Sequence, residues 1–172
     1  FIYTLSFIWR VVLPSLSVSR PELLKARYNS SGKAWVIVTG TTSGIGFAFC
    51  ALVLKLGFNL LMVSRNEGKL KETKNLLKNF GKKVEYITLD LSQPEVDFGE
   101  VEKFVSSNEV CMLINNAGLN TEYPKPFIGN SKEEISSMVT VNCHSMVLLT
   151  RICLASMVHR RCGAIINISS LF

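Results

Sequence analysis

The sequence predicts an α/β protein built on a doubly wound parallel sheet, a Rossmann-like fold that is incomplete after its fifth strand. Short runs that are apolar throughout alternate with longer stretches whose apolar residues recur at helical spacing, and a glycine-rich turn follows the first run. Strands that are apolar throughout are buried on both faces, which is typical of parallel sheets covered by helices. Right-handed crossovers then give the doubly wound arrangement.

Each element follows from its local pattern. The continuous run AWVIVT predicts the first strand, and four later runs of similar length predict the others. The expected strands are Ala34–Thr39, Leu60–Ser64, Val84–Leu89, Val110–Asn115 and Ala164–Ser169. The stretches between them are long enough for helices and carry amphipathic spacing. The expected helices are Ser43–Leu56, Glu67–Phe80, a weaker one over Val101–Ser106, and Ile135–Val158.

The apolar spacing also predicts the inward face of three of these helices. For the first helix, the residues expected to face the sheet are Ile45, Ala48, Leu52 and Leu56. For the second they are Leu70, Leu77 and Phe80, and for the last they are Val141, Ser145, Leu148, Leu149 and Ile152.

The first 32 residues form a separate region, and residues 33–172 form the predicted nucleotide-binding domain. Residue 1 is Phe rather than Met, and Phe1–Leu16 is apolar but broken by Arg10 and Pro14. This segment is shorter than the ~20 residues that span a bilayer. We favour the end of a membrane anchor over the alternative, an amphipathic arm lying on the domain. Ser17–Gly32 is expected to be a polar linker with a short helical turn.

Composition excludes several classes of protein. The 172 residues are 48% hydrophobic and carry 19 basic against 13 acidic residues, a net charge of +6. The basic excess lies in Phe1–Lys33 and Arg65–Lys83, without the interleaved aromatic residues that favour nucleic-acid binding. We therefore expect a basic segment beside a membrane and one solvated lysine-rich helix, and no nucleic-acid partner.

The five cysteines form no CxxC pair and no Cys/His ligand spacing, so no metal site is predicted. Each lies in or beside an apolar run, which predicts reduced, buried thiols. His144 and His159 have no acid or nucleophile in their sequence context and are expected at the surface or at helix ends.

The turn after the first strand carries the strongest functional signal. It reads Thr39-Gly40-Thr41-Thr42-Ser43-Gly44-Ile45-Gly46, a TGxxxGxG pattern at the start of a helix. Glycines allow positive φ and let a phosphate approach the backbone, and the helix N-terminus offers free N–H groups to a pyrophosphate. A P-loop is excluded because Phe47 stands where that motif needs lysine. The predicted cofactor-binding residues of this turn are Gly40, Thr41, Thr42, Ser43, Gly44, Ile45 and Gly46.

With four further motifs, this turn resembles the short-chain dehydrogenase/reductase family over roughly Lys33 to Phe172. The motifs are Asp90-Leu91 after strand three, Asn115-Asn116-Ala117-Gly118 after strand four, Val141-Asn142 in the long helix, and Asn167-Ile168-Ser169-Ser170 after strand five. Lys33-Ala34-Trp35, Tyr123-Pro124 and the run from Arg161 to Ser170 resemble one branch, the membrane-associated very-long-chain 3-oxoacyl-CoA reductases and 17-beta-hydroxysteroid dehydrogenases. That branch often has Val where this chain has Ala117.

The end of strand two indicates which nicotinamide cofactor is bound. A site that prefers NAD usually has an acid there for the ribose 2′-hydroxyl. Here the strand ends Ser64-Arg65-Asn66, with no acid. Because Arg65 can pair with a 2′-phosphate and Ser64 can add a hydroxyl donor, NADP(H) is the predicted cofactor. The alternative for Arg65 is a solvated residue at the start of the lysine-rich helix.

The resemblance implies roles for the other motif residues. Asp90 is expected to contact the adenine amino group with Leu91 beside it, and Asn115, Ala117 and Gly118 to line the adenine–ribose side. Asn115 has an alternative role as a polar clamp between strands. Asn142 is expected to be a buried amide that takes part in a proton relay, or else a structural residue. Ser170 is expected to polarise the substrate carbonyl, with Ser169, otherwise a cap at the strand end, as the alternative.

The resemblance implies hydride transfer between a nicotinamide and a carbonyl or hydroxyl of a lipid, steroid or 3-oxoacyl-CoA, in a protein that can dimerise. It further implies anchoring in the endoplasmic reticulum membrane, with the domain in the cytosol. The family's Tyr-x-x-x-Lys pair does not occur in these 172 residues. We therefore expect this chain to be inactive by itself, with a bare fifth strand. The alternative is a non-catalytic module that binds a nucleotide or a partner.

Overall fold

Five parallel strands form the centre of the computed structural model, which describes residues 21–121, 123 and 125–169. The strands are β1 (Trp35–Thr39), β2 (Asn59–Ser64), β3 (Val84–Thr88), β4 (Val110–Asn115) and β5 (Ala164–Asn167). Their order across the sheet is β3-β2-β1-β4-β5, so the chain moves outward from β1 in one direction and returns to build the other half. The predicted doubly wound, Rossmann-like parallel sheet is confirmed.

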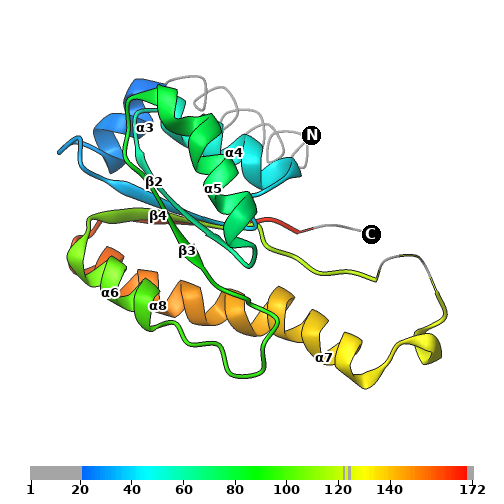
Figure 1. The fold of residues 1–172 in the computed structure, drawn as a ribbon. Coiled ribbons are helices and arrows are strands. Elements are labelled where there is room, and N and C mark those ends of the chain that lie inside the picture. Colours follow the sequence, from blue (N-terminus) through cyan, green and yellow to red (C-terminus); the bar gives the residue numbers. More distant parts are fainter. Residues whose placement is uncertain (1–20, 122, 124, 170–172) are drawn as a thin grey trace, which may run out of the picture.

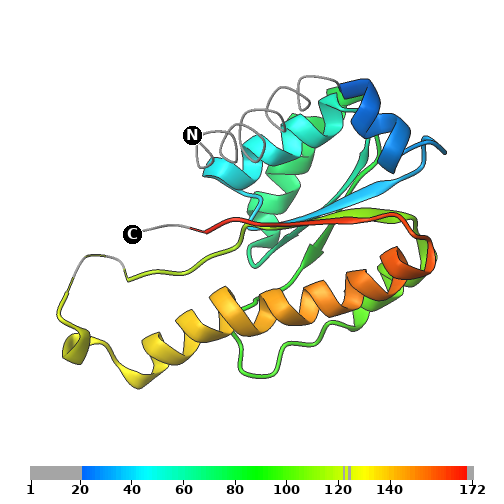
Figure 2. The same cartoon turned by 180° about the vertical axis from the view of Figure 1, so that it is seen from behind.

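Helices cover both faces of the sheet, and Figures 1 and 2 show the two layers from opposite sides. One layer holds α3 (Pro21–Tyr28), α4 (Gly44–Lys55) and α5 (Glu67–Leu77), which continues as the short helix Lys78–Phe80. The other layer holds α6 (Gly99–Ser107) and one long rod made of α7 (Lys132–Val139), a π-helical turn (Thr140–Ser145) and α8 (Met146–His159). A short helix at Phe127–Gly129 lies in the long connection from β4 to α7.

Alternate side chains of each strand enter two separate cores. On β1, Ile37 packs with α6 and α8, whereas Val36 and Val38 pack with α4 and α5. All residues of β1 and β2 are buried, but β5, at the edge of the described sheet, has three half-buried residues and an exposed Asn167. The run of apolar residues that predicted these strands is therefore explained by burial on both faces.

The predicted inward face of α4 is wrong at three of its four positions, and only Leu56, just after the helix, is half-buried against the core. Ile45 and Leu52 are 61% and 49% exposed, and Ala48 is also exposed. The buried residues are instead Gly46, Cys50, Val53 and Leu54. Because α4 is apolar around its whole circumference, spacing alone could not select a face; the packing of Gly46 against the preceding turn orients the helix.

The other two predicted faces agree with the structure. Leu70 and Leu77 of α5 are buried and Phe80 is half-buried, while Val141, Ser145 and Leu149 are buried in the long rod. This rod, Lys132–His159, is apolar and long enough to cross a membrane by composition, yet its buried side joins the core under the sheet.

Three of the five thiols are buried as expected. Burial raises the pKa of Cys50, Cys111 and Cys153 to about 12, which makes these thiols unreactive. The prediction is wrong for Cys143, which is exposed in the π-helical turn, and Cys162 is half-buried at the start of β5. His144 and His159 are exposed, as expected.

The N-terminal region reaches the domain through α3. The helical turn expected within Ser17–Gly32 spans Pro21–Tyr28. Just after it, the buried Asn29 amide donates to the Gly57 carbonyl and accepts from the Ala34 N–H. Phe1–Leu16, for which a membrane anchor was predicted, lies outside the described residues.

Candidate functional site

The turn between β1 and α4 is held in shape by glycines that accept no side chain. Gly40 has a φ of +68°, and a Cβ there would lie 2.9 Å from the Ala117 Cα. A Cβ on Gly46 would lie 2.1 Å from the Gly40 carbonyl oxygen, closer than any real contact. The glycines at the two ends of the motif are therefore fixed by packing of the turn on itself.

Asn116, which the sequence analysis did not single out as a site residue, joins this turn to β4. Its Nδ2 donates to the carbonyl oxygens of Thr39 and Gly40 at 3.0 and 3.1 Å. The Thr39 hydroxyl in turn accepts from the backbone N–H groups of Asn116 and Ala117. The adjacent Asn pair at the end of β4 was a usable signal, because successive side chains of a strand point to opposite faces of the sheet and the two amides must therefore have different partners.

The first turn of α4 keeps its amide groups free. Ser43, the residue before the helix, is extended and its side chain makes no capping hydrogen bond. The N–H groups at the start of a helix have no partner within it. Together with the helix dipole they form a positive end that suits a phosphate.

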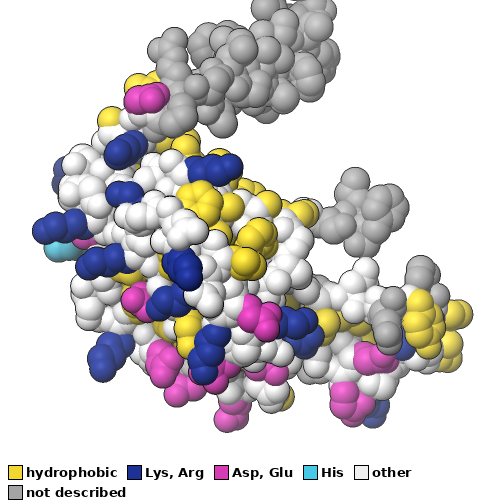
Figure 3. Space-filling view, turned by 45° about the horizontal axis from the view of Figure 1, so that its top comes forward, with side chains coloured by type: hydrophobic (Ala, Val, Ile, Leu, Met, Phe, Trp, Pro, Cys, Tyr) yellow, Lys and Arg dark blue, Asp and Glu magenta, His cyan; other side chains and the backbone are white. Residues whose placement is uncertain are grey.

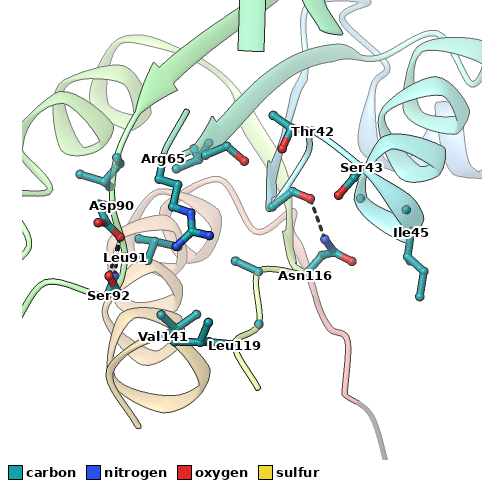
Figure 4. A pocket seen from close by; sticks show the side chains of 18 residues that line it. Thr42, Ser43, Ile45, Arg65, Asp90, Leu91, Ser92, Asn116, Leu119 and Val141 are labelled. Carbon is teal, nitrogen blue, oxygen red and sulfur yellow. Dashed lines mark hydrogen bonds between the residues drawn. The ribbon is translucent and has the colours of Figure 1, made fainter. Parts of the chain in front are cut away.

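A cavity of about 400 Å³ opens in front of this helix end, at the carboxyl ends of the strands (Figure 4). It joins the glycine turn to the ends of β2, β3 and β4 and to the π-helical turn. Its lining residues are Gly40, Thr42, Ser43, Gly44, Ile45, Gly46, Val63, Ser64, Arg65, Leu89, Asp90, Leu91, Ser92, Asn116, Ala117, Gly118, Leu119 and Val141. Most of the predicted cofactor-binding residues are therefore brought together, along with hydrophobic walls such as Val63 and Val141 that the motifs did not include.

Positive and negative groups face each other across one side of this cavity. Figure 4 shows the Arg65 side chain extending into the opening on the side of Asp90 and Leu91. Partial burial raises the pKa of Asp90, but hydrogen bonds from Ser92 and Gln93, with the nearby Arg65 charge, outweigh it and hold the pKa below its ordinary value. Ser64 accepts from the Thr41 N–H at 3.1 Å, which leaves its hydroxyl proton available to a ligand.

Two predicted cofactor-binding residues do not reach the cavity. Thr41 is fully buried beneath the turn. Asn115 is 5% exposed, and its amide donates to Thr150 Oγ1 and to Asn167 Oδ1 at 3.2 and 2.9 Å. The contacts of Asn115 with α8 and β5 favour the alternative, a polar clamp between strands.

Asn142 is exposed rather than buried, so that part of the expectation is wrong. It lies in the π-helical turn, and its amide both accepts from the Leu119 N–H and donates to the Leu119 carbonyl, each at 2.8 Å. This pair fixes the backbone that follows Gly118 beside the cavity. Ser170 lies outside the described residues.

Among the described residues, no group of three or more His, Cys, Asp or Glu side chains is placed to hold a metal ion. The polar groups of the cavity are instead of the kinds that receive a dinucleotide in α/β proteins. A glycine turn, an uncapped helix end and polar residues at the carboxyl ends of parallel strands define a dinucleotide-binding α/β protein.

Comparison with known proteins gives the family. Residues 34–172 match the short chain dehydrogenase family, to which this chain belongs. It is 34% identical over 171 residues to a very-long-chain 3-oxoacyl-CoA reductase of Podospora anserina, covering 96% of this chain and 48% of that protein. It is 32% identical over 168 residues to hydroxysteroid dehydrogenase-like protein 1 of Gallus gallus, covering 97% of this chain and 49% of that protein.

A solved structure agrees. The short-chain dehydrogenase from Sphingobium yanoikuyae in complex with NADPH superposes with a TM-score of 0.73 at 29% identity, covering 80% of this chain and 54% of that one. The resemblance to this family and to its 3-oxoacyl-CoA reductase and hydroxysteroid dehydrogenase branch is confirmed. The chain spans about half the length of these curated relatives.

Proposed function

We propose that this chain binds NADP(H) and serves an oxidoreductase reaction in which hydride passes between the nicotinamide and a carbonyl or hydroxyl group. One observation carries the proposal: a single cavity connects the uncapped end of α4 with Arg65, which lies at the end of the neighbouring strand β2. A diphosphate bound at the helix end would allow an adenosine 2′-phosphate to reach the Arg65 side of the same cavity.

Different residues of the chain are assigned to different parts of the cofactor. The backbone of Gly40 to Gly46 receives the diphosphate, with Thr42, Ser43 and Ile45 along its path. Arg65 and Ser64 hold the 2′-phosphate, because charge-assisted hydrogen bonds to phosphate are strong. Asp90 and Leu91 receive the adenine, and Ala117 and Gly118 line the ribose side. Thr41 and Asn115 support these contacts from below.

A bound NADPH would supply a hydride for the carbonyl carbon and would leave as NADP⁺, and the carbonyl oxygen would take a proton to become a hydroxyl. We assign polarisation of the carbonyl oxygen to Ser170. Asn142 holds the Leu119 backbone in the cavity lining through its two hydrogen bonds. The names of the relatives support a lipid-like substrate, a 3-oxoacyl-CoA or a steroid.

From the apolar Phe1–Leu16 and the family resemblance we further propose a place at the endoplasmic reticulum membrane, with this segment as the attachment, the domain in the cytosol and dimerisation of the protein. No tyrosine in these 172 residues is followed by lysine four positions later, so we propose that the chain by itself binds the cofactor without turning it over. This observation also supports the second candidate, a non-catalytic nucleotide-binding module.

Titration of the 172-residue chain with NADPH and NADH, followed by cofactor fluorescence, tests the cofactor proposal. NADPH is expected to bind at least about tenfold more tightly, since one or two charge-assisted hydrogen bonds separate the two ligands. Equal or tighter binding of NADH contradicts the assignment.

A second measurement addresses the reaction. NADPH oxidation is followed with a 3-oxoacyl-CoA and with a 3- or 17-ketosteroid, for this chain and for a protein in which it is joined to a Tyr-x-x-x-Lys helix from a relative. Turnover only by the joined protein supports the oxidoreductase assignment. NADPH binding without turnover by either protein favours the non-catalytic module.

A further inference from the structure

Charge is distributed unequally between the two ends of the strands. Where helices lead into strands, at the amino end of the sheet, seven basic residues gather against one acidic residue, Glu109. We call these seven residues the amino-end surface: Lys33, Lys55, Lys78, Lys82, Lys83, Arg160 and Arg161. Where strands lead into helices, the described connections carry Arg65 and Lys125 against Asp90, Glu95 and Asp97.

The charges of the amino-end surface are not neutralised within the protein. None of the seven forms an ion pair in the described part of the chain, whereas Lys71, Lys74 and Lys125 elsewhere each pair with a glutamate. Glu109 is itself engaged by the Ser31 hydroxyl at 2.6 Å. Figure 3 shows the Lys and Arg side chains spread along the left-hand side of the molecule, and Asp and Glu mostly along the lower edge.

Helix α3 joins the domain at this same end. Asn29, directly after α3, donates to the Gly57 carbonyl between α4 and β2, and the Cys162 thiol donates to the Arg27 carbonyl at 3.3 Å. On α3 itself, Lys25 and Arg27 are exposed and add two further positive charges, and Leu23 is 54% exposed. The N-terminal side of the chain therefore enters through the basic end and far from the cavity.

The short connection between Leu16 and α3 limits how far the amino end of the sheet can lie from a membrane that holds Phe1–Leu16. Only residues 17–20 separate Leu16 from the first residue of α3. Even fully extended, the path from Leu16 to Pro21 is at most about 18 Å. If Phe1–Leu16 is held in a membrane, as proposed above, the start of α3 lies within about two Debye lengths of the lipid headgroups, and the amino-end surface begins at the other end of this eight-residue helix.

We propose that the amino-end surface, with Lys25 and Arg27 of α3, docks on anionic lipid headgroups and orients the domain on the membrane. In this orientation the cavity, at the opposite end of the strands, faces water and admits the cofactor from solution. The inference rests on the proposed membrane attachment of the N-terminus. The positive charge of the surface is complementary to anionic lipid, which is therefore the partner we propose for it. Basic residues close to an anionic bilayer each strengthen binding by roughly fivefold.

Flotation of the full 172-residue chain with phosphatidylcholine vesicles, with and without phosphatidylserine, tests the proposal. The wild type is expected to bind phosphatidylserine vesicles more tightly, and high salt is expected to remove the difference. The variant Lys55→Glu/Lys78→Glu/Lys83→Glu should lose on the order of 100-fold in partitioning to phosphatidylserine vesicles, with its partitioning to pure phosphatidylcholine unchanged.

The matched control changes the same charge in the opposite layer. Lys103→Glu/Arg151→Glu/Lys132→Glu alters three exposed residues of α6, α8 and α7 and should change partitioning by less than about threefold. An equal loss in the control variant, or no preference of the wild type for anionic vesicles, overturns the proposal. So does tighter binding to duplex DNA than to phosphatidylserine vesicles at equal salt, since a nucleic acid would then be the better occupant.

Cofactor binding separates this proposal from the proposed function. Both triple variants are expected to bind NADPH as the wild type does, because their changes lie away from the cavity lining. A wild-type chain that binds NADPH but shows no preference for phosphatidylserine vesicles refutes only the docking surface. Absence of NADPH binding in the wild type refutes the cofactor proposal and leaves the vesicle result to stand by itself.

Discussion

The two ends of the sheet differ in whether their polar groups are hydrogen-bonded within the protein. At the amino end, buried amides are saturated by the loops around them: Asn59 donates to the Lys33 carbonyl and accepts from the Lys83 N–H, at 3.1 Å each. At the carboxyl end, the amides of the first turn of α4 and the Arg65 guanidinium are turned toward a cavity. Saturated polar groups stabilise a fold, whereas polar groups held open toward a cavity are available to a ligand.

The largest loss of both stability and NADPH binding is expected when the glycine turn is altered. Gly46→Ala places a Cβ 2.1 Å from the Gly40 carbonyl oxygen, so the turn and α4 must move apart. We expect a loss of at least about 3 kcal/mol in the free energy of unfolding, measured by urea denaturation, and no detectable NADPH binding. Gly68→Ala in α5 is the control, since its Cβ would meet only Asn66 Oδ1 at 3.4 Å and should change stability by less than about 1 kcal/mol. Similar losses in both variants would refute the steric explanation.

A change at the amino end should affect stability alone. Asn29→Ala removes two hydrogen bonds and leaves the Ala34 N–H and the Gly57 carbonyl without these partners. The expected cost is about 2 to 3 kcal/mol of unfolding free energy, with NADPH affinity unchanged in the variant that remains folded. The exposed Asn75→Ala in α5 is the matched control and should be nearly neutral. Weaker NADPH binding by Asn29→Ala, measured under conditions where it is folded, would contradict the separation of the two ends.

A change at the carboxyl end should affect binding alone. Arg65→Ala is expected to weaken NADPH binding by about 10- to 30-fold and to leave NADH binding and the urea midpoint unchanged, because the exposed guanidinium has no structural partner among the described hydrogen bonds and ion pairs. Lys78→Ala, which removes an exposed charge at the other end of the same helical segment, is the control. An equal effect on NADPH and NADH would show that Arg65 does not recognise a 2′-phosphate.

The smallest effect concerns pH. Because the pKa of Asp90 is held below its ordinary value in the folded chain, its ionised form contributes stability above the unfolded pKa of about 4, and this contribution is lost as the pH falls through the folded pKa. The difference in urea midpoint between wild type and Asp90→Asn should therefore be constant from about pH 7 to pH 5 and shrink below about pH 4. A difference that grows on acidification would contradict the direction of the shift.

The strands were predictable because burial on both faces leaves a continuous apolar run. Val110–Asn115 was located to the residue, and the other four strands differ by one or two residues at an end. The face of α4 was not predictable, because nearly every residue of this helix is apolar and the sequence therefore carries no contrast between its sides. Asn115 and Asn116 are adjacent residues of the same type, so the sequence could not assign them different roles. In the structure the Asn115 side chain bonds to Asn167 of β5, whereas the Asn116 side chain bonds to the Gly40 carbonyl of the glycine turn.

The sequence by itself determined the order of elements, the doubly wound sheet and the position of the glycine turn, because each depends on local patterns of apolar residues and on the conformational range of glycine. Only the tertiary structure decided which side of α4 packs inward, that Asn142 is an exposed clamp on Leu119, and that basic residues from four helix-to-strand connections share one surface. Those features depend on residues far apart in the chain, and parallel topology brings them together by placing the start of every strand at the same end of the sheet.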